Sequence, residues 1–338
     1  MKKISIKEIA QITGTSPSTV STVLNGKAKK GRISDALAQK ILTTAKTMGY
    51  TPNQVAVSLR TGQSKIIGLI VEDISNIFYA QIASVIEEEL KNLGYRIVYC
   101  STKNDRDNGA ALIDMLYQRQ VDGFIITPVE GMEASLSILQ EERKPLILID
   151  RYLPKLNLSH VLVDDKKGVQ VGMDHLLEKG YRKIGFVTVD LGQVEMNYRE
   201  KAYKEFVAEH AMPGGDGRFL KVPYMPEIAA MSEHITHWVG HRNELDALFF
   251  ATNYLCIAGL QSLQQLGRKI PDDIAVLCFD DHDIFALYPP GITAIRQPIK
   301  EIGEKAVALL MQQVESRETQ LQPSKLLLPG HLILRGST

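Results

Sequence analysis

Several kinds of residue and motif are scarce in this chain of 338 residues, and each scarcity argues against a class of protein. Its three cysteines, Cys100, Cys256 and Cys278, lie far apart in apolar surroundings, without the close pairing that a zinc or redox site requires. We therefore expect buried, reduced side chains. No segment reaches the roughly 18 uncharged apolar residues that span a bilayer, and the chain does not start with an apolar run of secretory length. A cytoplasmic protein is expected.

Catalytic patterns are scarce as well. The sequence has no nucleophile beside a matching base and no glycine-rich loop of the kind that cradles phosphate. His234, His237 and His241 recur at helical spacing, but no carboxylate or cysteine pattern beside them supports a metal site. The segment Val163 to Asp165 ends in two carboxylates that lack partners for acid–base chemistry. We expect no enzyme activity, no cofactor and no bound metal.

Acidic residues are almost missing from the beginning of the chain. From Met1 to Lys65 there are eleven lysines and arginines against two carboxylates, Glu8 and Asp35, which gives a balance of +9. Because the whole chain has 39 residues of each sign, the remainder has a balance of −9. A small basic head joined to a larger acidic body suggests that the head binds a polyanion such as nucleic acid. A solvated basic tail is the simpler alternative.

Apolar periodicity predicts three short helices in the head. The first has a stripe made of Ile6, Ile9, Ala10 and Ile12, and Gly14 ends it. The second begins with Ser16 as N-cap and Pro17 at the first helical position, and its apolar face is Val20, Val23 and Leu24. The third starts at Ser34, ends at Gly49 and uses Leu37, Ile41, Ala45 and Met48. Two helices about a glycine-containing turn, closed by a third, form a helix-turn-helix.

The second helix of the head has the composition of a DNA-reading element. Small hydroxyl residues surround its apolar face, and the segment from Ser16 to Gly26 has no carboxylate that would repel a phosphate backbone. We expect its first turn to face base edges in a major groove. A helical hairpin buried against another part of the protein is the alternative.

Several fragments of the head occur in the order found in one known family. "ISIKEIAQITGTSPSTVSTVLNG" is followed by "MGYTPNQVAVSLRTGQSKIIGLIVEDISNIFYAQI", and the sequence resembles the LacI/GalR transcriptional repressors over essentially its whole length. The resemblance implies a helix-turn-helix domain at 1–51, a hinge helix and linker at 52–64, and a two-subdomain effector-binding and dimerisation core at 65–338.

The resemblance also assigns DNA contacts. Pro17, Ser18 and Thr22 match positions that face bases, and the segment from Pro52 to Leu59 matches a hinge helix that folds on operator DNA. Its leucine, Leu59, would insert into the minor groove, where a wedge bends the duplex; an ordinary buried leucine is the alternative. The complete expected DNA-binding set is Ser16, Pro17, Ser18, Thr19, Thr22, Asn25, Lys29, Asn53 and Leu59.

Two departures from the family pattern lie in the head. Thr22 stands where many relatives have arginine, which removes a guanine contact worth about 1–3 kcal/mol of discrimination. The loop from Lys27 to Ser34 is longer than the common form, and its lysines and arginine either contact phosphates or remain solvated. The operator sequence therefore does not follow from that of a relative.

After Lys65, apolar strands alternate with amphipathic helices. The runs "KIIGLIVE", "YRIVYCS", "VDGFIITP", "PLILID", "KIGFVTV", "ALFFAT" and "IAVLCFDD" indicate parallel sheets covered on both faces. A weak internal echo, "LKNLGYRIVY" against "LLEKGYRKIGFV", predicts two similar α/β halves. A ligand is then expected in the crevice at the carboxyl ends of the strands.

The resemblance implies a periplasmic-binding-protein-like core of two parallel-sheet subdomains with several crossovers. It assigns effector contacts to Phe78, Tyr79, Arg151, Arg199, Tyr224, Asn253 and Asp280. An arginine fork and a carboxylate each grip paired hydroxyls, and an aromatic face covers apolar C–H groups, so this set suits a sugar or sugar acid. Gln193 and Glu195 differ from the residues that purine-binding relatives have at these positions, so we do not expect a purine effector.

These observations predict a homodimeric, sugar-responsive repressor of double-stranded operator DNA with no membrane partner. Whether the effector releases or promotes DNA binding stays open, as does a dimer against a tetramer. The alternative from another class is a cytosolic sugar-binding or sugar-modifying protein with an incidental basic head.

Overall fold

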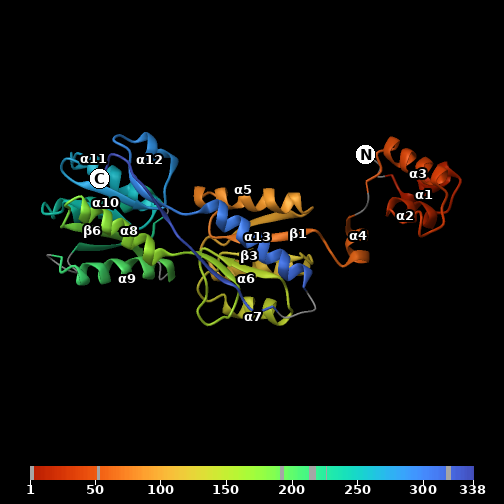
Figure 1. Ribbon diagram of the computed structural model, residues 1–338, viewed down its shortest axis with the longest axis horizontal. Helices are drawn as coiled ribbons and strands as arrows, with labels where there is room; N and C mark the ends of the chain where they lie inside the picture. The colour runs from red at the N-terminus through yellow and green to blue at the C-terminus, as the bar shows by residue number, and fades with distance from the viewer. Residues whose placement is uncertain (1–3, 52–53, 191–193, 213–217, 226, 317–320) are drawn as a thin grey trace. The chain divides into compact units, whose positions relative to one another are not determined.

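The computed structural model describes residues 4–51, 54–190, 194–212, 218–225, 227–316 and 321–338. Two compact units divide the chain between Ser64 and Lys65 (Figure 1). We call residues 1–64 the head and residues 65–338 the core, and describe each by itself.

Three helices with defined caps build the head. They are α1 (Ile6–Thr13), α2 (Pro17–Leu24) and α3 (Asp35–Thr47). Ser5 and Glu8 form a reciprocal capping box at the start of α1, and Gly14 ends that helix in the left-handed conformation at φ 71°. The Ser16 hydroxyl accepts from the Thr19 amide at 3.1 Å and caps α2, with Pro17 in the first turn, as the sequence predicts.

A small apolar cluster holds the three helices together. Its buried members are Ile9, Ala10, Val20, Val23, Ala38, Ile41 and Ala45. The predicted stripes supply all of these residues except Ala38, which is buried where Leu37 was expected and Leu37 is only partly buried. A second difference lies in α1. Ile12 is 56% exposed, because the turn at Gly14 leaves it on the outer face of α1, and Thr13 is buried instead.

A fourth helix, α4 (Gln54–Thr61), follows within the head. It covers most of the segment expected to form a hinge helix. Leu59 on this helix is 75% exposed, so it is not a buried core leucine. Asn53, which the resemblance assigns to DNA, lies outside the described residues.

The core contains two six-stranded sheets with matching strand orders. The first sheet runs β11-β5-β4-β3-β1-β2 and the second runs β12-β10-β9-β8-β6-β7. All described strand pairs are parallel except β10 with β12. The first sheet comprises β1 (Ile66–Val71), β2 (Arg96–Ser101), β3 (Gly123–Ile126), β4 (Leu146–Ile149), β5 (His160–Val163) and β11 (Lys325–Leu328). The second comprises β6 (Ile184–Asp190), β7 (Phe219–Pro223), β8 (Ala247–Phe250), β9 (Ala275–Phe279), β10 (Thr293–Arg296) and β12 (His331–Ile333).

Helices cover both faces of each sheet, and the buried strands are almost wholly apolar. With the first sheet lie α5 (Ile77–Asn92), α6 (Arg106–Gln118), α7 (Glu133–Glu141) and α13 (Ile299–Glu315) (Figure 1). With the second lie α8 (Asp165–Glu178), α9 (Val194–Glu209), α10 (Ile228–Gly240), α11 (Asn253–Gln265) and α12 (Asp283–Leu287). We call these halves the first and second subdomains.

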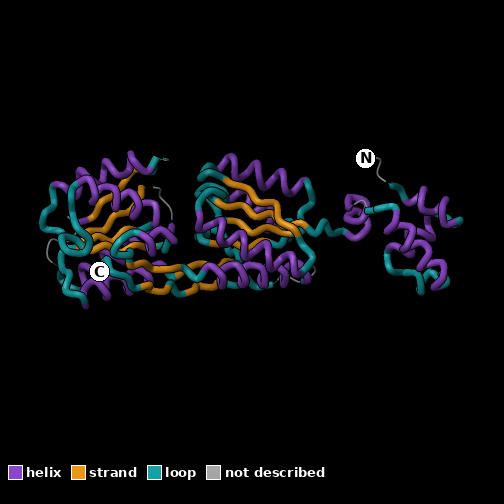
Figure 2. The backbone as a smooth tube through the Cα atoms, turned by 90° about the horizontal axis from the view of Figure 1, so that it is seen from above, coloured by secondary structure: helices purple, strands orange, loops and turns teal. Residues whose placement is uncertain are grey.

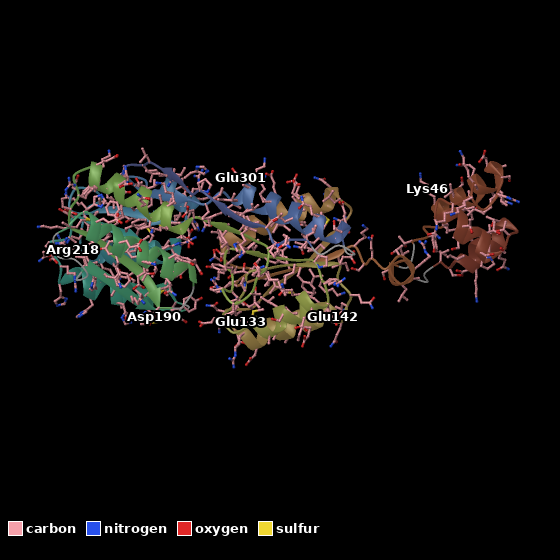
Figure 3. All side chains as sticks on the ribbon, turned by 60° about the horizontal axis from the view of Figure 1, so that its bottom comes forward. Lys46, Glu133, Glu142, Asp190, Arg218 and Glu301 are labelled. Atoms are coloured by element: carbon pink, nitrogen blue, oxygen red, sulfur yellow. The ribbon has the colours of Figure 1, made fainter. Side chains whose placement is uncertain are left out.

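Three segments cross between the subdomains. They lie between β5 and α8, between β10 and α13, and between β11 and β12. Figure 2 shows crossing chain along one side of the core. Charged side chains such as Glu133, Arg218 and Glu301 lie on the periphery, whereas the two sheets are buried (Figure 3).

Seven of the strands were expected from continuous apolar runs. The others in the described chain, β5, β7, β10, β11 and β12, are short segments of three to five residues. One cysteine also departs from expectation, because Cys100 is half-buried on β2 while Cys256 and Cys278 are buried.

Candidate functional site

The carboxyl ends of the strands of both subdomains face one cavity in the core. Of the seven predicted effector contacts, Phe78, Tyr79, Arg151, Arg199, Asn253 and Asp280 line it. Tyr224 is not among its lining residues. It is 43% exposed, and its ring lies edge-on to the ring of Tyr254, which does line the cavity, with 6.4 Å between centroids.

Two aspartates end equivalent strands at the cavity. Asp150 follows β4 and Asp280 follows β9, and each strand is third in the order of its sheet. Both residues have positive φ, 65° and 72°, a conformation that non-glycine residues rarely adopt. Each amide donates to the neighbouring strand, to Val161 and Ile295 respectively, so the ladder holds both carboxylates at the strand ends.

Arg199 on α9 is held inside the second subdomain. Its Nε donates to Asp165 at 2.7 Å, and its Nη1 donates to the Ala251 carbonyl at 2.6 Å and to Asp280 at 3.2 Å. The guanidinium carbon lies 3.7 Å from the centre of the Phe279 ring. Only 2% of Arg199 is exposed, so these carboxylates and the aromatic face replace water around its charge.

Arg151 instead connects the two subdomains. Its Nη2 donates to Glu72 at the end of β1, and its Nε donates to Glu195 on α9 at 2.6 Å. The next residue repeats the connection, because the hydroxyls of Tyr152 and Tyr198 lie 2.7 Å apart. We call the pairs Arg151–Glu195 and Tyr152–Tyr198 the clasp.

Burial shifts the protonation of the acidic groups around the cavity. It raises the pKa of Asp150 to about 7, although the charge of Arg151 opposes this rise, and it raises the pKa of Asp165 to about 6 against the effect of Arg199. Burial likewise raises the pKa of Glu195. These carboxyls take up protons far more readily than exposed ones.

Protein contacts also hold the aromatic groups of the cavity wall in position. The Tyr79 hydroxyl donates to Asp150 at 2.8 Å, and the Phe78 ring meets the Tyr79 ring edge-on at 5.1 Å. Burial raises the pKa of Tyr79 well above its usual value, so its hydroxyl remains a donor. Asn76 caps α5 by accepting from the Phe78 amide, which fixes the start of the helix that supplies both rings.

Sequence reasoning did not assign several residues that complete this site. Glu72, Asp165 and Tyr254 have no role in the expected contact set, and Glu195 was considered only as a difference from purine-binding relatives. Glu72 and Asp165 each lie just after the carboxyl end of a strand, and this position in the sequence could have identified them as site residues.

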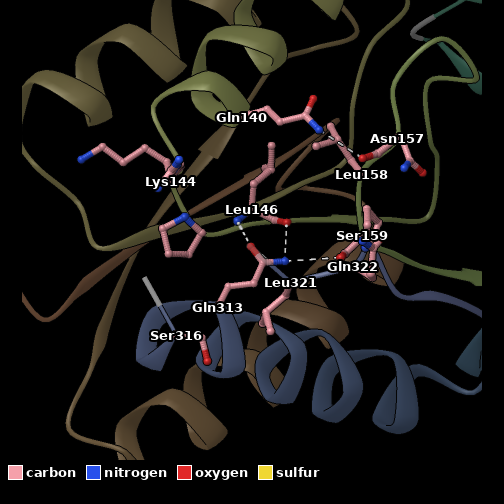
Figure 4. Close-up of a pocket in the computed structure, with 13 residues that line it drawn as sticks. Gln140, Lys144, Leu146, Asn157, Leu158, Ser159, Gln313, Ser316, Leu321 and Gln322 are labelled. Atoms are coloured by element: carbon pink, nitrogen blue, oxygen red, sulfur yellow. Dashed lines mark hydrogen bonds between the residues drawn. The ribbon is translucent and has the colours of Figure 1, made fainter. Parts of the chain in front are cut away.

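The central cavity measures about 50 Å³, which is room for a few water molecules but not for a sugar. A different pocket of about 220 Å³ lies between α13 and the strand β4 (Figure 4). There the Gln313 amide accepts from the Leu146 amide and donates to its carbonyl, and it also reaches Ser159. The polar groups of this pocket bind each other, so they serve to hold α13 against β4. The pocket also lies apart from the carboxyl ends of the strands.

In the head, seven of the nine predicted DNA-contact residues lie on α2, at its caps or in the chain after it, whereas Leu59 lies on α4 and Asn53 lies outside the described residues. Ser16, Pro17, Ser18, Asn25 and Lys29 are exposed, and Thr19 and Thr22 are half-buried. The Thr22 hydroxyl donates to the Ser18 carbonyl at 2.9 Å. Asn25, at the end of α2, accepts from Arg60 on α4 at 2.7 Å, so these two helices are linked.

The described residues contain neither a candidate metal site nor a candidate membrane helix. Within the described residues, no cluster of three His, Cys, Asp or Glu side chains could hold a metal ion. None of the helices in the described ranges is long and apolar enough to cross a membrane.

A helix-turn-helix head followed by two parallel-sheet subdomains around a polar cavity defines the class of ligand-responsive DNA-binding regulators. Residues 5–53 match the model for bacterial regulatory proteins of the lacI family, and residues 173–338 match the periplasmic binding protein-like domain. The HTH-type transcriptional regulator DegA of Bacillus subtilis (strain 168) is 30% identical over 99% of this chain and 98% of its own length. The chain therefore belongs to the lacI family of transcriptional regulators.

Other relatives agree. The ribose operon repressor of Escherichia coli (strain K12) is 27% identical over 98% of this chain and 99% of its own. The fold is that of the lac repressor dimer bound to operator and the anti-inducer ONPF, with a TM-score of 0.86, 19% identity and coverage of 99% of both chains.

Proposed function

We propose that this regulator is a homodimeric repressor whose affinity for operator DNA is controlled by a sugar-like effector in the core cavity. The observation that carries the proposal is the joint presence of a basic head with an acid-free α2 and a cavity lined by two arginines and several carboxylates. Paired guanidinium and carboxylate groups suit vicinal hydroxyls, and aromatic rings cover the C–H faces of a sugar. Regulators of the family whose names refer to ribose support a polyhydroxylated effector.

The clasp suggests how the two functions are coupled. Because Arg151 and Glu195 both line the cavity and bind each other across the two subdomains, an effector that enters the cavity competes for the same groups. Displacing the clasp changes how the subdomains meet, and an effector that binds the two arrangements unequally shifts the equilibrium between them. By linkage, effector and DNA then change each other's affinity by one common factor.

DNA binding is tested with a charge placed at the recognition helix. Ser18→Glu puts a carboxylate on the exposed first turn of α2, and we expect at least a tenfold loss of affinity in gel shifts with duplexes selected from a random pool by the full chain. Thr43→Glu makes the same charge change on exposed α3 and is the matched control. Equal affinity of both variants and the wild type would sink the DNA-binding role of α2.

Leu59 is tested by its effect on specificity. Its 75% exposure leaves it available to insert into a minor groove. For Leu59→Ala we expect the affinity for selected duplexes to fall more than the affinity for random DNA. Leu42→Ala, at another exposed leucine of the head, is the control. An unchanged ratio of the two affinities refutes the wedge.

The proposed dimer has a surface consistent with it. Ile77 at the start of α5 and Ile284 and Leu287 on α12 are exposed apolar residues, and Leu287 is 79% exposed. Figure 1 shows α5 and α12 along the upper side of the core, with α7 at the lower side. Two heads in one dimer would bind a near-palindromic operator.

The oligomeric state is tested by sedimentation. Leu287→Glu should move the full chain from dimer to monomer, because a carboxylate at a shared apolar surface loses its hydration. Ile138→Glu on α7, also exposed, should leave the dimer intact. A wild-type chain that sediments as a monomer at micromolar concentration contradicts the proposal.

A further inference from the structure

Negative charge outnumbers positive charge around the core cavity. Four carboxylates line it, from Glu72, Asp150, Glu195 and Asp280, against the two guanidinium groups of Arg151 and Arg199. Asp165, bound to Arg199, adds a fifth carboxylate immediately behind the wall. Even with Asp150 protonated, which its raised pKa of about 7 favours, the lining has an excess of one negative charge, or two with Asp165. In a water-poor site such an excess is costly until a cation offsets it.

Both arginines already donate to protein groups. Arg199 binds Asp165, Asp280 and the Ala251 carbonyl, and Arg151 binds Glu72, Glu195 and the side-chain oxygen of Asn104 at 3.1 Å. A carboxylate or phosphate on a ligand would have to displace a protein carboxylate from one of them and would then face the remaining ones. The cavity is therefore built against anions.

Aromatic rings also line the cavity, and together with the carboxylates they favour a cation. Phe78, Tyr79 and Tyr254 line the cavity together with the carboxylates. An ammonium group gains from the faces of such rings as well as from carboxylates. Neither lysine nor histidine occurs among the residues that line this cavity.

We propose that the natural effector is a polyhydroxylated cation, an amino sugar or a related amino polyol, and this inference rests on the proposed function of the cavity. The ammonium group binds between Glu72 and Glu195, and the hydroxyl groups bind Arg199, Asp280 and Asn253. The Arg151 guanidinium stays at the cavity beside Asp150, from which its Nε lies 3.6 Å away. The ligand therefore adds a cation to the lining while it releases the clasp. Of the sugar or sugar acid expected from the sequence, it keeps the sugar and replaces the acid by a group of opposite charge.

Matched sets of ligands test the charge directly. The full chain is titrated at about pH 7 by calorimetry and thermal unfolding with glucosamine, glucose and glucuronate, and with the corresponding galactose and mannose sets. The amino group is largely protonated at this pH. In at least one set we expect the amino sugar to bind at least about tenfold more tightly than the neutral sugar, with the acid weakest. A neutral or acidic member that binds as tightly, or failure of every amino sugar to bind, overturns the proposal.

Two substitutions locate the effect. Glu195→Gln and Glu72→Gln should each lower the preference for the amino sugar over its neutral parent by about tenfold. Glu233→Gln, on the exposed side of α10, is the matched control. A structural defect would weaken both ligands alike, so an unchanged preference in both variants contradicts the proposed position of the ammonium group.

Gel shifts separate this inference from the function on which it rests. If a neutral or acidic sugar alters DNA affinity, the regulator remains and the charge assignment fails. If an amino sugar binds as expected without altering DNA affinity, the charge assignment remains and the coupling fails.

Discussion

The two subdomains of the core share one backbone plan but use it differently at the cavity. In each, the third strand of the sheet ends in an aspartate with positive φ, Asp150 in the first and Asp280 in the second. The residue after Asp150 is Arg151, which crosses to Glu195 of the other subdomain. The residue after Asp280 is Asp281, which binds Arg296 at 2.6 Å and Arg335 at 2.8 Å within its own subdomain.

Because of this difference, the two subdomains pair their charged groups in different ways. The second subdomain is a closed charge network in which Arg199 and Asp281 stabilise their own surroundings. In the first subdomain Arg151 binds Glu72 of its own half and also Glu195 of the other half, and Tyr152 binds Tyr198, so part of these contacts exists only when the halves meet. A ligand can therefore replace the contacts between the two subdomains at lower cost than the contacts within the second subdomain.

The largest expected effect comes from Arg199. Arg199→Ala leaves Asp165 and Asp280 buried without their cation, and we expect the free energy of unfolding to fall by about 3–5 kcal/mol. Urea unfolding of the full chain measures it, with Arg182→Ala, in the same subdomain at a largely exposed site, as the control. A loss no larger than that of the control would show that Arg199 does not hold the second subdomain together.

Asp150 should make stability depend on pH near neutrality. Its pKa is raised to about 7 from 3.8 by burial, so its protonated form is favoured in the folded state. The stabilisation it gives is complete below about pH 4 and is lost as pH rises through about 7. Asp150→Asn should remove this slope and raise stability at about pH 8 by about 2–4 kcal/mol. Unfolding curves from about pH 5 to pH 8 with the same slope in variant and wild type would contradict this.

The contribution of Asp281 to stability should depend on pH with the opposite sign. Its carboxylate accepts from Arg335 and Arg296, and these bonds hold its pKa below its ordinary value despite burial. Its contribution is therefore present above about pH 4 and is lost as pH falls below that value. Asp281→Asn should lower stability at about pH 7 by about 1–3 kcal/mol and reduce the acid sensitivity. Greater stability of this variant at neutral pH would refute the assignment.

The smallest expected effect is that of the tyrosine pair in the clasp. Tyr152→Phe removes one hydrogen bond between partly exposed hydroxyls, and we expect a loss of about 0.5–1.5 kcal/mol. Tyr198→Phe should cost a similar amount, and the double variant little more than either single one. Strict additivity in a thermal or urea double-mutant cycle would mean that the two hydroxyls do not interact.

Much of the fold follows from local sequence. Continuous apolar runs mark the strands that are buried on both faces, and Ser16 and Pro17 mark the start of α2. Short strands such as β12 depend instead on pairing with a distant segment, here β10. No local pattern states that partner.

Local sequence predicts the candidate site only in part. Arg199 and Asp280 lie in sequence motifs that match the family, and their elements, α9 and the chain after β9, belong to one subdomain. Glu72 and Glu195 are 123 positions apart in sequence and meet only through Arg151. The charge balance of the cavity is a property of all these residues together, so no single motif predicts it.

The central claim is that the core cavity and the head share one equilibrium. It is tested most directly by measuring the DNA affinity of the full chain with and without the tightest-binding sugar of the panel, and the affinity for that sugar with and without DNA. We predict that both ratios differ from one by at least about fivefold and equal each other. Ratios of one, for a sugar that calorimetry shows to be bound, would contradict the account.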